Sequence, residues 1–223
     1  MTIRAKLYAA IVLTILGPLA TTAVALHGMG QLGDRFDEVR EHAAKEALAL
    51  GLKFDVTDVN GWQTAYGYDG GRSRPRFERS VAAFRRDLRR AARTLGDPGE
   101  RELLSRLRGE FRAFMGLDVA AYRELRAGRE ERTRAIFLGP EIQRFEAMAA
   151  TADDLADYEA RRAAATERGF DDARDDARRR LIAVAAGAAV VIVLLLVTAN
   201  DIARMALEGE RRTRRRPDTP SPE

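Results

Sequence analysis

The chain has 223 residues, of which 38 are lysine or arginine and 34 are aspartate or glutamate, so its formal charge is +4. It contains no cysteine, which excludes disulfide bonds, zinc–thiolate sites and thiol nucleophiles. The basic residues alternate with acidic ones instead of forming one basic stripe, so we do not expect a nucleic-acid-binding protein.

The first predicted element is a membrane-spanning helix over residues 7–26, which carry no charged side chain. A bilayer core needs about 20 apolar residues in a helix, and this stretch has that length. The alternative is a cleaved signal peptide, because Arg4 and Lys6 precede the apolar stretch and residues 23–25 (AVA) are small enough for a cleavage site. We expect an uncleaved anchor with residues 1–6 in the cytoplasm, since signal peptides have shorter apolar regions.

The first long helix is expected to leave the membrane at His27 and to end near Asp69, before two glycines. Residues 58–69 of this helix, DVNGWQTAYGYD, hold the only tryptophan and two of the five tyrosines. Heptad spacing predicts one inward-facing stripe, comprising Leu48, Leu52, Asp55, Val59, Trp62, Tyr66 and Asp69. In the simplest interpretation, Asn60 and Gln63 then face solvent.

A second helix is predicted by apolar residues at alternating spacings of four and three: Phe77, Val81, Phe84, Leu88, Ala91 and Leu95. It ends at LGDPGE, where Gly96 suits a C-cap, Asp97 an N-cap and Pro98 the first position of the next helix. The third helix has the same spacing, with one polar residue in its stripe: Leu104, Leu107, Phe111, Phe114, Asp118, Ala121 and Leu125.

A fourth helical stretch is expected over about residues 129–180, continuing into a second uncharged membrane span over 181–199. Pro140 lacks a backbone donor and is expected to kink or break this stretch. Beyond it, one stripe is predicted to face the core: Ile142, Phe145, Ala149 and Ala152. The acidic stretch 171–176 (DDARDD) is expected to be a solvated, salt-bridged face rather than a metal site. The basic tail, 200–223, is expected to be disordered.

These elements predict an all-α protein, because no segment has the two-residue alternation of a strand. The expected architecture is an up-down-up-down four-helix bundle, residues 27–180, on two transmembrane helices. Two spans place both termini on the same side of the membrane. Because a loop of this length is expected to be translocated, we expect the bundle outside the cytoplasm and both termini inside.

The order of these elements and several stretches resemble the four-helix-bundle sensor module of bacterial methyl-accepting chemotaxis proteins, over about residues 1–200. The stretches are RAKLYAAIVL, LHGMGQL, DVNGWQTAYGYD, FERSVAAFRRDL, ELLSRLRGEFRAF and FLGPEIQRFEAMA. The resemblance implies ligand sensing, signal transduction and homodimerisation. Receptors of that family continue into a cytoplasmic linker and a long signalling hairpin, whereas this sequence ends about two dozen residues after the second span. We therefore expect any signal to pass through another protein.

The aromatic stretch 58–69 admits three interpretations: a packing plug, a subunit contact or a ligand site. A buried carboxylate is costly unless it is paired or hydrogen-bonded, so we expect the acids on the inward stripes to meet arginines of the second helix, to accept hydrogen bonds from Tyr66 and Trp62, or to mark a wet cavity. Aromatic walls with carboxylates would suit a cationic or amine-bearing molecule. The candidate ligand-binding residues are Asp55, Asn60, Trp62, Gln63, Tyr66, Asp69 and Asp118.

We expect a membrane-anchored sensor that binds a small ligand or a protein partner outside the cytoplasm. The alternative is a structural or accessory membrane protein that pairs with a receptor and binds no small molecule. An enzyme is not expected, because the chain has no Gly-x-Ser-x-Gly, Walker-type or His-Glu-x-x-His motif. Neither a cofactor nor a metal site is expected.

Overall fold

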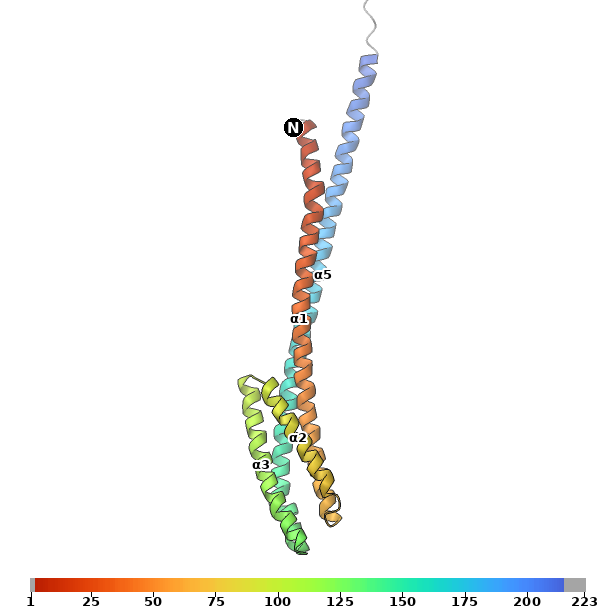
Figure 1. Ribbon diagram of the computed structural model, residues 1–223. Coiled ribbons are helices and arrows are strands. Elements are labelled where there is room, and N and C mark those ends of the chain that lie inside the picture. The colour runs from red at the N-terminus through yellow and green to blue at the C-terminus, as the bar shows by residue number, and fades with distance from the viewer. Residues whose placement is uncertain (1–2, 215–223) are drawn as a thin grey trace, which may run out of the picture. The chain divides into compact units, whose positions relative to one another are not determined.

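The computed structural model describes residues 3–214, leaving aside the side chains of residues 3–7, 9–11, 13, 201–202 and 205–214. In chain order the helices are α1 (Ile3–Tyr68), α2 (Arg74–Thr94), α3 (Pro98–Arg126), α4 (Glu130–Ile136), the π-helical turn η1 (Phe137–Glu141) and α5 (Ile142–Arg214) (Figure 1). No strand occurs over residues 3–214, so the prediction of an all-α protein is confirmed.

The chain forms two compact units. The terminal unit comprises Met1–Asp34 and Asp171–Glu223, and the central unit comprises Arg35–Phe170. In the terminal unit, several apolar residues of α5 are 55–64% exposed and face outward: Ile192, Val193, Leu194, Leu196 and Val197. Within the described residues, the stretch Glu130–Asn200 contains a segment long and apolar enough to cross a membrane.

The first predicted span, 7–26, includes several side chains outside the described set. Of those described, Ile15 and Leu19 are 56% and 60% exposed. The prediction that residues 200–223 are disordered is partly wrong, because α5 continues as a helix to Arg214. Residues 200–214 consist mostly of strong helix formers, and the first proline after them is Pro217. The remainder of the predicted tail, 215–223, lies outside the described residues.

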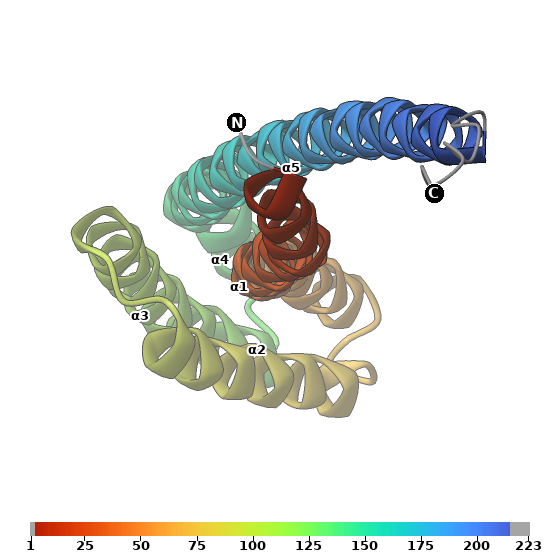
Figure 2. The ribbon, with the colours of Figure 1, turned by 90° about the horizontal axis from the view of Figure 1, so that it is seen from above.

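The core of the central unit draws on α1, α2, α3 and α5. Every residue predicted for the inward stripe of α2 is buried, and so are those predicted for α3 except Leu125, which is partly buried. Aromatic pairs link these helices: Tyr66 of α1 packs on Phe77 of α2 with ring centres 5.4 Å apart, and Phe84 of α2 packs on Phe111 of α3 at 4.8 Å. Figure 2 shows the α2–α3 hairpin closed by its short turn.

Local sequence explains where the helices of the central unit begin and end. At the start of α3, Asp97 Oδ1 accepts a hydrogen bond from the backbone N–H of Glu100, and the Glu100 side chain accepts one from the N–H of Asp97. Between α1 and α2, Gly70 and Gly71 have φ of 69° and 95°, a conformation that glycine adopts without strain. The C-cap of α2 is Leu95 in an extended conformation, not the predicted Gly96.

The predicted inward stripe of α5 is wrong at three of its four residues. Ile142 is 37% exposed, and Phe145 and Ala149 are only partly buried. Ala152 is buried as predicted, and the other buried residues of this helix are Met148, Thr151, Leu155, Ala156 and Glu159. Two causes combine: the break at Gly139 and Pro140 resets the rotation of the following helix, and its many alanines allow more than one apolar face.

Candidate functional site

Three of the predicted site residues meet in the interior of the central unit. Gln63 and Tyr66 lie one turn apart on α1 and Asp118 lies on α3, and their side chains are 3%, 0% and 0% exposed. Tyr66 donates its hydroxyl hydrogen to Asp118 Oδ1, and Gln63 Nε2 lies 3.3 Å from the same oxygen. Burial, together with the charge of Asp118, raises the pKa of Tyr66 above its usual range, so Tyr66 remains a hydrogen-bond donor.

Arg74, in the first turn of α2, supplies the positive charge for this carboxylate. Its Nη1 lies 2.9 Å from both carboxylate oxygens of Asp118. Its guanidinium carbon lies 4.9 Å, 4.6 Å and 4.4 Å from the ring centres of Tyr66, Phe77 and Tyr122. Aromatic faces attract cations, so three rings and a carboxylate enclose this guanidinium. The sequence suggested that aromatic rings and a carboxylate would bind a cationic ligand. In the structure this combination instead holds the guanidinium of Arg74.

Glu141 is a second buried acid beside this cluster. It ends η1, in which Gly139 has non-helical backbone angles and Pro140 has no N–H to donate. Its side chain is 1% exposed; Oε1 accepts a hydrogen bond from Gln63 Nε2, and Oε2 is buried without a hydrogen-bond partner. Burial raises the pKa of Glu141 to about 8; the charge of Asp118 acts in the same direction, and the hydrogen bond from Gln63 opposes it.

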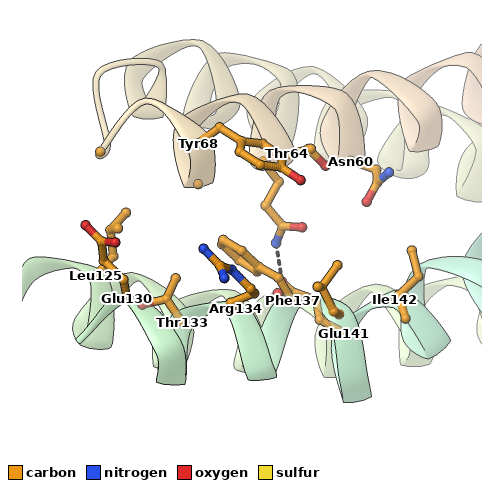
Figure 3. A pocket seen from close by; sticks show the side chains of 14 residues that line it. Asn60, Thr64, Tyr68, Leu125, Glu130, Thr133, Arg134, Phe137, Glu141 and Ile142 are labelled. Atoms are coloured by element: carbon orange, nitrogen blue, oxygen red, sulfur yellow. Dashed lines mark hydrogen bonds between the residues drawn. The ribbon is translucent and has the colours of Figure 1, made fainter. Parts of the chain in front are cut away.

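Glu141 and Gln63 line a cavity of about 260 Å³ between the end of α1 and the α4–η1 segment. Figure 3 shows Asn60, Thr64 and Tyr68 of α1 across the cavity from the side chains of α4 and η1. The complete lining is Asn60, Gln63, Thr64, Gly67, Tyr68, Gly70, Leu125, Glu130, Thr133, Arg134, Phe137, Leu138, Glu141 and Ile142. The volume lies just below the roughly 300–1,000 Å³ typical of small-molecule sites, so the cavity suits a small ligand.

The remaining predicted site residues do not join this group. Asn60 lines the cavity. Trp62 is partly buried, and the guanidinium carbon of Arg76 lies 4.7 Å from its ring centre. Asp55 is partly buried, and burial, reinforced by the nearby Asp87 carboxyl on α2, raises its pKa to about 6. Asp69 accepts a hydrogen bond of 3.1 Å from the backbone N–H of Ser73 and so shapes the turn before α2.

Two features of the site differ from the sequence prediction. Gln63 was expected to face solvent, but it is buried, because its amide hydrogens bridge the carboxyl groups of Asp118 and Glu141. Arg74 and Glu141 were not predicted as site residues. Each stands next to a proline at a helix boundary, and from the sequence such prolines indicate only where a helix begins or breaks.

A metal centre has no support in the described part of the chain. No group of three or more histidine, aspartate or glutamate side chains lies close enough there to hold an ion. In the DDARDD stretch, Asp176 instead pairs with Arg180 at 2.6 Å, as expected of a salt-bridged face. The buried cluster brings together the carboxyl of Asp118, the phenol of Tyr66, the amide of Gln63 and the guanidinium of Arg74, which interact by charge and hydrogen bonds.

Comparisons of the chain with protein-family models, with curated proteins and with solved structures find no match.

Proposed function

We propose that this protein is a membrane-anchored sensor that binds a small ligand in the cavity between α1 and η1 and signals through another protein. The observation that carries the proposal is the cavity itself, with the unpartnered Glu141 Oε2 among the atoms of its lining residues. A buried polar atom without a partner is costly, and a ligand that reaches it would offset that cost. This organisation would resemble the sensor module of methyl-accepting chemotaxis proteins.

The proposed architecture is an up-down-up-down four-helix bundle over residues 27–180, carried by spans at 7–26 and 181–199. The outward-facing apolar side chains of α5 in the terminal unit support the second span, because lipid is the environment that accepts such a surface. In this topology both termini lie in the cytoplasm and the cavity lies outside it.

Signal transmission would use the two long helices. α1 and α5 are each one continuous helix with residues in both units. A shift of either helix at the cavity can therefore pass along the helix into its membrane-spanning segment. A ligand shifts such an equilibrium only if it binds one arrangement more tightly than the other. The break in η1 lies beside the cavity, and Pro140 there has no N–H to donate, so fewer helical hydrogen bonds oppose a small change in backbone angles.

A homodimer is part of the proposal and is supported by an exposed, uncharged stripe on α1 in a chain that is 32% charged. Its residues follow heptad spacing and comprise Ala43, Ala47, Leu50, Phe54, Thr57 and Gly61, all exposed. Leu50 and Phe54 are 49% and 71% exposed. The same stripe supports the second candidate function, an accessory protein that packs against a receptor and binds no small molecule.

Ligand binding by the full-length protein in lipid nanodiscs distinguishes the two candidates. Trp62 is the only tryptophan and lies one residue from Gln63, so its fluorescence reports on the cluster. We expect a saturable change in fluorescence, with a matching rise in thermal midpoint, for one class among amines, organic acids, polyols and phosphates. If folded protein responds to none of these classes, the accessory function stands and the sensor proposal is wrong.

A further inference from the structure

The charges around the cavity are balanced except at one position. Asp118 is paired with Arg74 through hydrogen bonds of 2.9 Å to both carboxylate oxygens. Glu141 has no cation of its own: its only hydrogen-bond partner is the Gln63 amide, and Oε2 has none. Ionised Glu141 would therefore leave one negative charge uncompensated in the protein interior.

The mouth of the cavity adds little net charge. Glu130 and Arg134 both line it and stand four residues apart on α4, acid before base, which is the order that favours pairing on a helix. Both residues are exposed, so water also screens them. The charge preference of the site is consequently set by Glu141 in the interior.

Neutral groups near Glu141 are also suited to a cation. Asn60 and Thr64 lie one turn apart on α1 and face the cavity, where each has an oxygen able to accept a hydrogen bond (Figure 3). Phe137 contributes an aromatic wall, held by its packing on Tyr66 with ring centres 5.9 Å apart. An ammonium group has three donors and no acceptor, which matches one carboxylate and two neutral oxygens beside an aromatic ring.

We propose that the cavity binds a small organic ammonium ion, with Glu141 as the carboxylate that holds its positive charge. The inference rests on the proposed sensor function and specifies its ligand class. The neighbouring enclosure of Arg74 by Asp118 and three rings is a second instance, in the same interior, of a cation held by a carboxylate and aromatic faces.

Binding is then linked to the release of a proton. Without ligand, Glu141 has a pKa of about 8 and is mostly protonated at pH 7. The groups that face it are Gln63 and Tyr66 of α1, Arg74 of α2 and Asp118 of α3, and none of them supplies a free positive charge. An ammonium ion favours the carboxylate, so the affinity should rise by up to about tenfold per pH unit from pH 6 to 8 and level off above it.

The test uses calorimetry on the full-length protein in nanodiscs. The probes are ethanolamine and larger primary amines, each with its neutral alcohol counterpart and its carboxylic-acid counterpart. We expect the amines to bind and the counterparts to bind at least tenfold more weakly. Titrations in two buffers of different ionisation enthalpy should show about one proton released per amine bound at pH 7.

Two variants assign the effect. Glu141→Gln keeps a carbonyl acceptor for Gln63 but cannot carry a charge, and we expect it to fold, to lose at least tenfold in amine affinity and to abolish proton release. Glu146→Gln, at an exposed position on α5, should change neither quantity.

The outcomes separate this inference from the proposed function. Binding of acids or alcohols in preference to amines, or amine binding unchanged in Glu141→Gln, overturns the ammonium assignment and leaves the sensor function in place. Absence of binding by every class to folded protein overturns both.

Discussion

Arg74 Nη1 lies 2.9 Å from both carboxylate oxygens of Asp118, and Asp118 is completely buried. The pair joins α2 to α3 at the point where Tyr66 and Gln63 of α1 also donate to the same carboxylate. The Asp118 carboxylate thus connects three helices of the central unit.

Removing one partner of this pair should destabilise the protein strongly. For Asp118→Asn we expect a loss of about 3–5 kcal/mol in the free energy of unfolding, because Arg74, largely enclosed by three rings, keeps only the exposed Glu78 as a counter-ion. Arg74→Met should cost a similar amount, and the double variant should cost much less than the sum of the two. Urea unfolding of the detergent-solubilised protein measures all three, and additive losses would show that the pair is not coupled.

Glu159 should make the protein less stable as pH rises. It is fully buried on α5; burial, together with the neighbouring Glu100 carboxyl, raises its pKa from 4.5 to about 7. The folded protein therefore holds this proton between about pH 5 and pH 7, where the unfolded chain has released it, and stability falls across that range. Glu141 and Asp55 act in the same direction, since their pKa values are also raised.

Glu159→Gln should therefore reduce this pH dependence, with a gain on the order of 2 kcal/mol at pH 8 relative to the wild type and little change at pH 5. Thermal unfolding at both pH values measures it. Glu102→Gln, at an exposed position of α3, is the control and should leave the pH dependence as it is. Equal effects of Glu159→Gln at pH 5 and pH 8 would contradict the assignment.

Two glycines of α1 should respond to alanine in opposite directions. A Cβ at Gly67 would lie 2.5 Å from Cε2 of Phe137, so the ring that walls the cavity would have to move, whereas a Cβ at Gly61 would meet no atom within 4 Å. We expect Gly67→Ala to destabilise by about 1–3 kcal/mol through overpacking. Gly61→Ala should stabilise by up to about 1 kcal/mol through helix propensity. Thermal midpoints of both variants, with the amine titration above, decide whether Phe137 is fixed in place.

The exposed stripe of α1 can be tested by cross-linking, because the chain has no cysteine of its own. If two copies pack through this stripe, Phe54→Cys should form a disulfide-linked dimer in membranes under mild oxidation. Arg79→Cys, exposed on α2, is the control and should remain monomeric on non-reducing gels. Equal cross-linking of both variants, or of neither, would argue against a dimer through α1.

The α2–α3 hairpin could be predicted almost completely from the sequence. Its apolar residues recur at spacings of three and four without ambiguity. The start of α3 is fixed locally by the capping box of Asp97 and Glu100 and by Pro98 at the first helical position. The stripe of α5 could not be predicted in the same way. Its alanines offer several faces of similar apolarity, and which face turns inward depends on the break at Gly139 and on the helices that pack against it.

The sequence by itself determined the helical composition, the breaks between helices, and the apolar stretches 7–26 and 181–199, because these depend on local properties of the chain: periodicity, backbone freedom and hydrophobicity. Only the tertiary structure decided which polar residues are buried and what they contact. Gln63 lies inside because two acids from α3 and η1 converge on its amide, and Arg74 occupies the enclosure that Asp118 and three rings create. Such partners are distant in the chain. The free-energy cost of burying a charge depends on whether a residue of opposite charge lies in contact with it in the folded protein.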